Sequence, residues 1–130
     1  MRRNVLKFHY EEIVFILMIL ATTDLKDYHE GDLMNFAEAI LRLDSLADKD
    51  FLKKLKPINI KINNYVINRL IDLQHELSSL YDSKLHKALS KESNTISKCL
   101  IISRQLLMRL NEEYTEPTKY AEKHMDVDWD

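Results

Sequence analysis

The chain of 130 residues has the length of a single domain, with 45% hydrophobic residues, 31% charged residues and a net charge of −2. This charge excludes a general attraction to nucleic acid, and the single glycine excludes a Gly-rich phosphate loop. The single cysteine, Cys99, excludes an intramolecular disulfide and indicates a reducing compartment, which we expect to be the cytoplasm.

The composition also favours one fold class. There are 20 leucines, two prolines and one glycine, so the chain has little material for the tight turns of a β protein. Leucine is a good helix former, and few breaks favour long helices. The composition therefore predicts an all-α fold.

The segment Ile13–Ala21 is nine apolar residues without a break. As a helix it would span roughly 13 Å, too short for a bilayer core of about 30 Å. Glu11 and Glu12 directly before it argue against a signal peptide. A helix that is apolar all round is buried all round, so we expect this segment to be the central helix of the fold.

A polar connection, residues 24–32, follows this helix. We expect Gly31 to form its turn and Asp32 to cap a second helix. The apolar face of that helix is spaced by three and four residues: Leu33, Phe36, Ala37, Ile40, Leu43 and Ala47. Asp48 or Asp50 would then cap a short helix that Pro57 ends.

Residues 58–62 alternate like a strand, but no partner strand follows, so we expect an extended segment that leads into the next helix. Asn59 or Asn63 would cap that helix, whose core stripe is Val66, Leu70, Leu73, Leu77 and Leu80. A break or kink is expected between residues 82 and 94. The last helix would carry Ile96, Leu100, Ser103, Leu107, Leu110 and Tyr114 and would end at Pro117.

These elements predict an up-and-down bundle of four main helices, with one or two short helices and an acidic C-terminal tail. We expect residues 1–117 to form the single helical domain and residues 118–130 to form the tail. The tail is either frayed or a docking arm.

The charge is distributed unevenly along the chain. Residues 11–50 carry −7, residues 51–61 carry +4 and residues 111–130 carry −5. The two acidic regions suit a basic partner, because complementary charge speeds the encounter of two proteins. The partner-binding residues expected from these regions are Asp24, Asp27, Glu30, Asp32, Glu112, Glu113, Glu116 and Trp129.

Arg69 and His75 are separated by five residues on the fourth helix. This spacing resembles the Arg–His motif of HEPN-domain ribonucleases, which are also small and all-helical. The resemblance implies that both residues would act on an RNA phosphodiester and its 2′-hydroxyl. Leu70 departs from the polar residue that often follows the arginine in that family, and the last helix has no second copy of the motif.

Other patterns point to binding rather than to catalysis. Four lysines fall on roughly one helical face and could contact nucleic acid, although no aromatic residue lies among them: Lys84, Lys87, Lys91 and Lys98. The five histidines form no HExxH motif, and no serine or cysteine stands in a nucleophile motif. We expect no metal and no cofactor.

The sequence thus favours a non-catalytic protein that binds a basic partner. Bacterial immunity proteins and antitoxins that block nuclease toxins are similar in size, charge and helical class, which is an analogy of class only. Two alternatives remain, a HEPN-like ribonuclease that uses Arg69 and His75 and a helical regulator that binds nucleic acid. We expect no association with a membrane.

Overall fold

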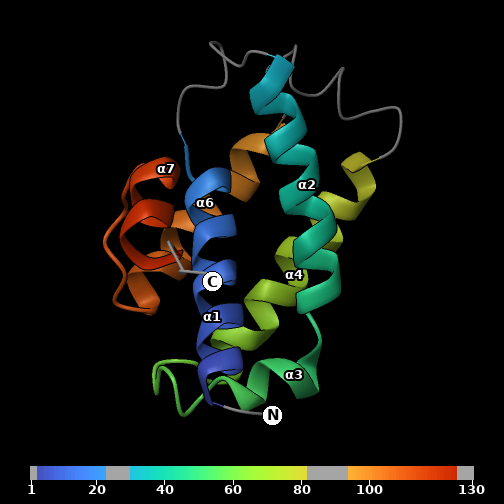
Figure 1. Ribbon diagram of the computed structural model, residues 1–130. Helices are drawn as coiled ribbons and strands as arrows, with labels where there is room; N and C mark the ends of the chain where they lie inside the picture. Colours follow the sequence, from blue (N-terminus) through green and yellow to red (C-terminus); the bar gives the residue numbers. More distant parts are fainter. Residues whose placement is uncertain (1–2, 23–29, 82–93, 126–130) are drawn as a thin grey trace.

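The computed structural model describes residues 3–22, 30–81 and 94–125, and the side chains of residues 5–22, 38–78 and 97–124. In these ranges every regular element is helical, which confirms the all-α class. The longer helices are α1 (Arg3–Leu20), α2 (Glu30–Leu46), α4 (Asn64–Tyr81) and α6 (Asn94–Arg109). The shorter ones are α3 (Lys49–Lys54), α7 (Pro117–Tyr120) and a π-helix, Ala121–Met125 (Figure 1).

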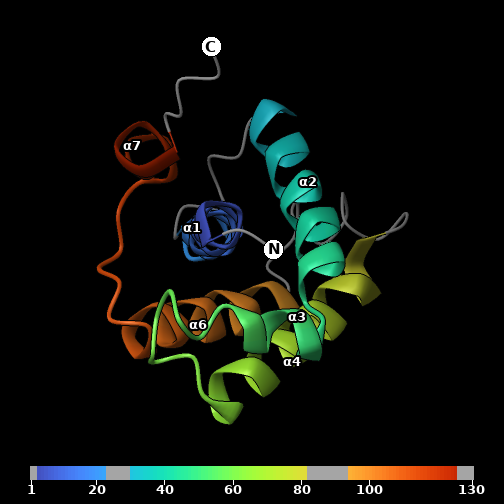
Figure 2. The same cartoon turned by 60° about the horizontal axis from the view of Figure 1, so that its bottom comes forward.

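Helix α1 lies at the centre of the fold. It contacts α2, α6, α7 and the π-helix, and Figure 2 looks nearly along its axis. Seven of the nine residues in the apolar segment 13–21 are buried, and the other two, Phe15 and Ile19, are partly buried and pack against the core. The prediction of a central buried helix is therefore confirmed.

The four longer helices form a closed ring of contacts. Helix α2 contacts α1 and α4, and α6 contacts α4 and α1. This ring follows the chain order that an up-and-down bundle requires. In Figure 2, however, α1 is seen end-on while α2 and α6 are seen from the side, so the helix axes are inclined to one another.

Two of the expected helix caps are present. The Asp48 side chain accepts a hydrogen bond from the Phe51 backbone N–H at 2.9 Å and caps α3. The Asn63 side chain accepts one from the Val66 N–H, also at 2.9 Å, at the start of α4. The core stripe of α4 is buried from Val66 to Leu77, as its spacing predicts.

The start of α2 differs from the prediction. This helix begins at Glu30, so Gly31 and Asp32 stand within its first turn and neither forms the expected turn or cap. An acidic residue suits the first turn as well as the cap, because both lie at the positive end of the helix dipole. The presence of an acidic residue therefore could not predict at which residue α2 begins.

The segment between α3 and α4 is a series of turns instead of the extended segment that we expected. The Ile58 N–H donates to the Leu55 carbonyl at 2.9 Å, and the Ile62 N–H donates to the Asn59 carbonyl at 3.1 Å. Asn59 fixes these turns, because its side-chain oxygen accepts from the Lys61 N–H at 2.9 Å. Asn59 is thus a turn residue rather than a helix cap.

Helix α6 ends at Arg109, earlier than predicted. Asn111 has a φ of 60°, in the left-handed region that glycine usually occupies at helix ends. The Asn111 N–H donates to the Met108 carbonyl at 3.0 Å, and the Glu112 N–H donates to the Leu107 carbonyl at 2.8 Å. These two bonds form a Schellman motif, so Asn111 ends the helix in a chain that has almost no glycine.

Pro117 begins a helix instead of ending one. It stands at the first position of α7, where the missing N–H of proline removes no hydrogen bond. Tyr120 of this helix is buried in the core, and α7 and the π-helix both pack against α1. The residues assigned to an acidic tail are therefore helical as far as Met125. None of the described helices is both long and apolar enough to cross a bilayer.

Leu17→Ala tests the central role of α1. Leu17 is fully buried, so we expect the free energy of unfolding to fall by about 2–5 kcal/mol in urea titrations. Leu41→Ala is the matched control, because Leu41 on α2 is 47% exposed and should cost less than about 1 kcal/mol. Equal losses of unfolding free energy in the two variants would contradict the burial of α1.

Candidate functional site

The residues from Asn111 to Glu116, here named the acidic loop, join α6 to α7. They include the three described members of the predicted acidic surface: Glu112, Glu113 and Glu116. Three contacts hold the loop against α1 and the residues directly after it. The Glu112 carboxylate accepts from the Tyr10 hydroxyl at 2.7 Å, the Thr115 N–H lies 3.2 Å from the Met18 sulfur, and the Tyr114 and Thr22 hydroxyls are 3.3 Å apart.

Tyr10 connects the acidic loop to the rest of the fold. Its hydroxyl donates to Glu112 and accepts from the Asn59 side-chain amide at 2.8 Å, and the same amide donates to the Leu110 carbonyl at 2.9 Å. Burial, and then the hydrogen bond to Glu112, raise the pKa of the Tyr10 hydroxyl above its ordinary range. The hydroxyl stays protonated at physiological pH, so the Glu112 carboxylate has a permanent internal donor.

The outer side of the acidic loop is exposed. Glu113, Tyr114 and Glu116 all face solvent, and Glu116 lies 4.0 Å from Lys119 on α7. The Arg104 guanidinium lies 6.0 Å from the centre of the Tyr114 ring, and its Nε donates to the Ala21 carbonyl at 3.2 Å. The loop thus presents two carboxylates and one phenol from a fixed backbone.

The other members of the predicted acidic surface are not placed. Asp24, Asp27 and Trp129 lie outside the described residues, as do the side chains of Glu30 and Asp32. One contact bears on their position. Thr22, the last described residue before the acidic connection, touches Tyr114 of the acidic loop. These two residues therefore lie side by side, although 92 positions separate them in the sequence.

Arg69 and His75 line one hollow on the surface. This open hollow has a volume of about 400 Å³, and Asp72, Glu76, Lys98 and Ile102 complete it. Arg69 lies 3.6 Å from the Asp72 carboxylate. Lys98 donates to Glu76 at 2.9 Å, and this hydrogen bond raises the pKa of Lys98. Each cation therefore has a carboxylate beside it, which weakens the attraction of the hollow for a phosphate.

The lysine face expected from residues 84 to 98 is described only at Lys98. Lys84, Lys87 and Lys91 lie outside the described residues. Lys98 is the lysine that pairs with Glu76 in the hollow. A stripe of free cations along this face is therefore not seen in the part that is described.

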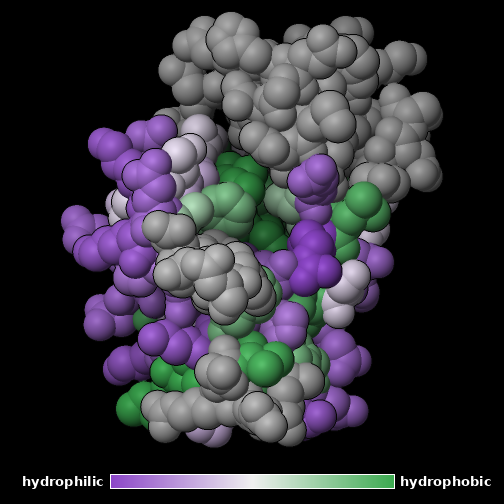
Figure 3. Space-filling view, viewed as in Figure 1, coloured by the Kyte–Doolittle hydropathy of each residue, from purple (hydrophilic) through white to green (hydrophobic). Residues whose placement is uncertain are grey.

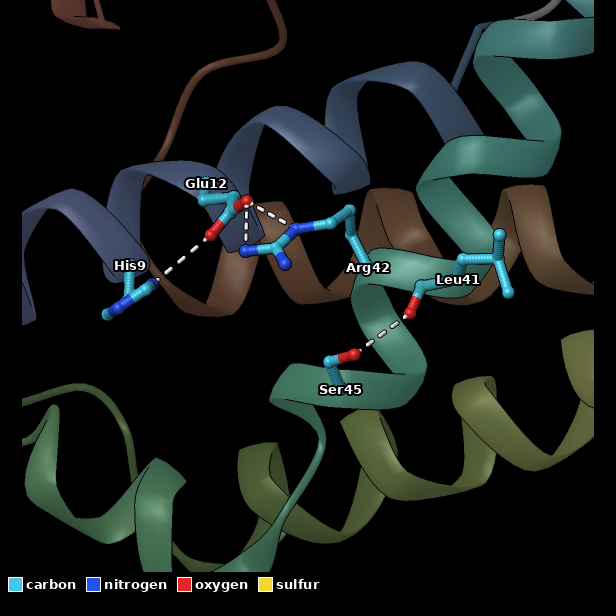
Figure 4. Close-up of polar contacts among 5 residues, drawn as sticks. All are labelled: His9, Glu12, Leu41, Arg42 and Ser45. Carbon is cyan, nitrogen blue, oxygen red and sulfur yellow. Dashed lines mark hydrogen bonds and ion pairs between the residues drawn. The ribbon is translucent and has the colours of Figure 1, made fainter.

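A further polar cluster was missed at the sequence level. Glu12 accepts from two nitrogens of Arg42, at 2.7 and 2.6 Å, and its other oxygen lies 3.2 Å from His9 Nδ1 (Figure 4). The His9 ring packs edge-on against Phe51 at 5.5 Å. Ser45, the hydroxyl drawn nearby, donates to the Leu41 carbonyl of its own helix. The cluster joins α1, α2 and α3, and the spacing of His9 and Glu12 was the available signal.

The single thiol is inert in the folded protein. Cys99 is buried, and this burial raises the pKa of its thiol to about 12, so that almost no thiolate forms at neutral pH. Among the described residues, no three histidine, cysteine or acidic side chains gather where they could hold a metal ion.

The chain matches no family model, no curated protein and no solved structure. Its function has to follow from its own side chains. The acidic loop is exposed and fixed, whereas Arg69 and Lys98 of the hollow stand beside carboxylates.

Tyr10→Phe tests the attachment of the acidic loop. The change removes the hydroxyl shared by Glu112 and Asn59 and leaves both without their inner partner, so we expect a loss of about 1–3 kcal/mol in the free energy of unfolding. Tyr65→Phe is the control, because Tyr65 is exposed. Urea titrations that give the same small change for both variants would contradict this attachment.

Proposed function

We propose that this protein is a non-catalytic binding protein of the inhibitor or immunity type, which docks a basic partner such as a nuclease toxin. The observation that carries the proposal is the acidic loop. Its backbone is held against α1, while Glu113, Tyr114 and Glu116 remain exposed. A loop that is already ordered loses less conformational entropy when it binds, so more of its contact energy appears as affinity.

The chemistry of the loop suits a cationic surface. Two carboxylates can pair with lysine or arginine side chains, and the Tyr114 ring supplies apolar area together with a hydroxyl. Aromatic residues are common anchors of protein interfaces. Negative charge around the anchor would speed the encounter with a basic partner.

The acidic surface in this proposal includes the connection between α1 and α2. The contact between Thr22 and Tyr114 supports this extension, because Asp24 follows two residues after Thr22. With Asp27, Glu30 and Asp32, the connection would add four carboxylates beside the loop. We also propose Trp129 as an outer anchor, since it belongs to the same acidic end of the sequence.

The scaffold in this proposal is an up-and-down bundle that works in the cytoplasm as one domain. That domain extends beyond the expected end at residue 117, because α7 and the π-helix pack against α1. The ring of contacts among α1, α2, α4 and α6 supports the bundle. The buried thiol of Cys99 is compatible with a reducing compartment.

Charge reversal of the loop tests the docking site. The partner can be trapped in the host cell by a photo-crosslinking residue at position 114, and the product of the neighbouring gene is the first candidate. The double variant Glu113→Lys with Glu116→Lys should weaken the complex by at least about tenfold, measured by calorimetry, because it turns two attractions into repulsions.

The matched control is Glu38→Lys with Asp50→Lys, which makes the same charge change at exposed positions of α2 and α3. The dissociation constant of this control variant for the partner should stay close to that of the natural protein. Both are measured at high salt, which screens long-range charge effects. An equal loss of affinity in both variants would remove the acidic loop from the proposed interface.

The second candidate function is a HEPN-like ribonuclease, and the observation in its favour is that Arg69 and His75 line the same hollow. We expect the purified protein and its variants Arg69→Ala and His75→Ala to show only background RNA degradation, because in this hollow Asp72 stands beside Arg69 and Glu76 beside Lys98. Cleavage that both variants abolish would establish the ribonuclease and refute a non-catalytic protein. A regulator acting through Lys84, Lys87, Lys91 and Lys98 would instead show salt-dependent binding of nucleic acid without cleavage.

A further inference from the structure

One end of the molecule carries a group of exposed positive charges. Lys53, Lys54, Lys56 and Lys61 are all exposed, and within the described ranges none of them lies in an ion pair. The turns after α3 keep Lys53 and Lys56 close together, since the Lys56 N–H donates to the Lys53 carbonyl at 3.3 Å. The carboxylates of α3 belong to Asp48 and Asp50, at the opposite end of that helix from Lys53 and Lys54.

Helix α6 adds a fifth cation to this end. Arg109, in its last turn, lies over the Tyr65 ring with its guanidinium 4.1 Å from the ring centre. Leu110, the next residue, accepts the hydrogen bond from Asn59, which fixes the lysine-bearing turns beside the end of α6. Figure 2 shows the 55–63 segment next to the end of α6 and the start of α4. We name this surface the basic end: Lys53, Lys54, Lys56, Lys61 and Arg109.

Two exposed hydrophobic side chains stand next to these charges in the sequence. Ile60 is 77% exposed and Met108 is 79% exposed, the two highest values among the large hydrophobic residues that are described. Ile60 stands directly before Lys61, and Met108 directly before Arg109. Hydrophobic atoms also reach the surface at the lower edge of Figure 3, where the 55–63 segment runs in Figure 1. An aliphatic group held outside the core among cations needs an external partner to leave water.

We propose that the basic end binds the surface of a membrane that contains anionic phospholipid. The lysines and Arg109 lie against the phosphate headgroups, and Ile60 and Met108 enter the boundary between the headgroups and the acyl chains. Apolar insertion and charge attraction then act together, which is how peripheral proteins without a lipid anchor bind reversibly.

The side chains favour lipid over the other polyanions. A single-stranded nucleic acid needs aromatic faces for stacking, but the ring of Tyr65 already carries Arg109, and Ile60 and Met108 offer no face to a base. Lysine is depleted at protein interfaces, whereas four of the five cations here are lysines. A fluid layer of headgroups can adjust to flexible lysines that no internal contact fixes.

This inference goes beyond the proposed function and is independent of it. It replaces the expectation from the sequence that the protein has no association with a membrane. None of the residues of the basic end belongs to the acidic loop, so a variant of one surface leaves the residues of the other unchanged. Failure of one binding event therefore leaves the other measurable.

Cosedimentation of the full chain with vesicles tests the proposal. We expect binding to vesicles of phosphatidylcholine mixed with phosphatidylglycerol, weaker binding at high salt, and little binding to phosphatidylcholine alone. Lys54→Gln with Lys61→Gln should lower the partition coefficient about 25-fold, since each lysine near an anionic surface contributes about fivefold. The matched control, Lys119→Gln with Lys123→Gln, removes two exposed lysines from α7 and the π-helix and should bind almost as the natural protein does.

The apolar part has its own variant, Ile60→Ser with Met108→Ser, which should bind at least tenfold more weakly to the mixed vesicles, while Leu41→Ser on α2 should not. Circular dichroism confirms that each variant is folded. Absence of binding to the mixed vesicles, or equal losses in the lysine variant and its control, would overturn the proposal. Binding of nucleic acid in mobility-shift assays, or binding of polyglutamate, would also overturn the proposal if the lysine variant abolishes that binding but still binds vesicles.

Discussion

The structure depends on keeping α1 out of water on every side. Its apolar residues are too numerous for one face, so a single neighbouring helix could not cover them. Helices α2 and α6 cover two sides, and the short α7 and the π-helix cover a third, which explains why the chain turns back at Pro117 and buries Tyr120. The residues of α7 and the π-helix therefore belong to the core because they cover the apolar helix α1 near the start of the chain.

A second constraint is the group of hydrogen bonds around Tyr10. One hydroxyl on α1 meets the carboxylate of Glu112 and the amide of Asn59, from two segments that are far apart in the sequence. Both segments are irregular, and helical hydrogen bonds cannot fix them. The acidic loop and the turns of the basic end are thus attached at one point of the central helix, and their outer side chains are left free to meet partners.

Periodic and short-range signals allowed much of the fold to be predicted. The apolar segment of α1, the stripe from Val66 to Leu77 and the caps Asp48 and Asn63 all depend on residues within a few turns of one another. The errors arose where one residue type suits more than one structural position. Asn111 took a left-handed position usually given to glycine, and Pro117 opened a helix. Asn59 fixed a turn through its contact with Lys61, while its amide bonds distant residues.

The candidate sites were less predictable than the helices. Glu112, Glu113 and Glu116 look equivalent in the sequence, but only the fold shows that Tyr10 holds the first of them and leaves the other two exposed. The pairing of Arg69 with Asp72 is a local event on α4, whereas the pairing of Lys98 with Glu76 needs α4 and α6 side by side. The basic end combines a charge run visible in the sequence with exposed aliphatic groups that are not.

The burial of Cys99 has a practical consequence. A lone thiol on the inner side of α6 can meet a solution reagent only while that part of the protein is transiently open. The rate at which a disulfide reagent labels the folded chain therefore reports how often the protein opens there, without any engineered cysteine. The labelling rate of this natural thiol therefore measures local opening of the protein while ligands are added at either surface.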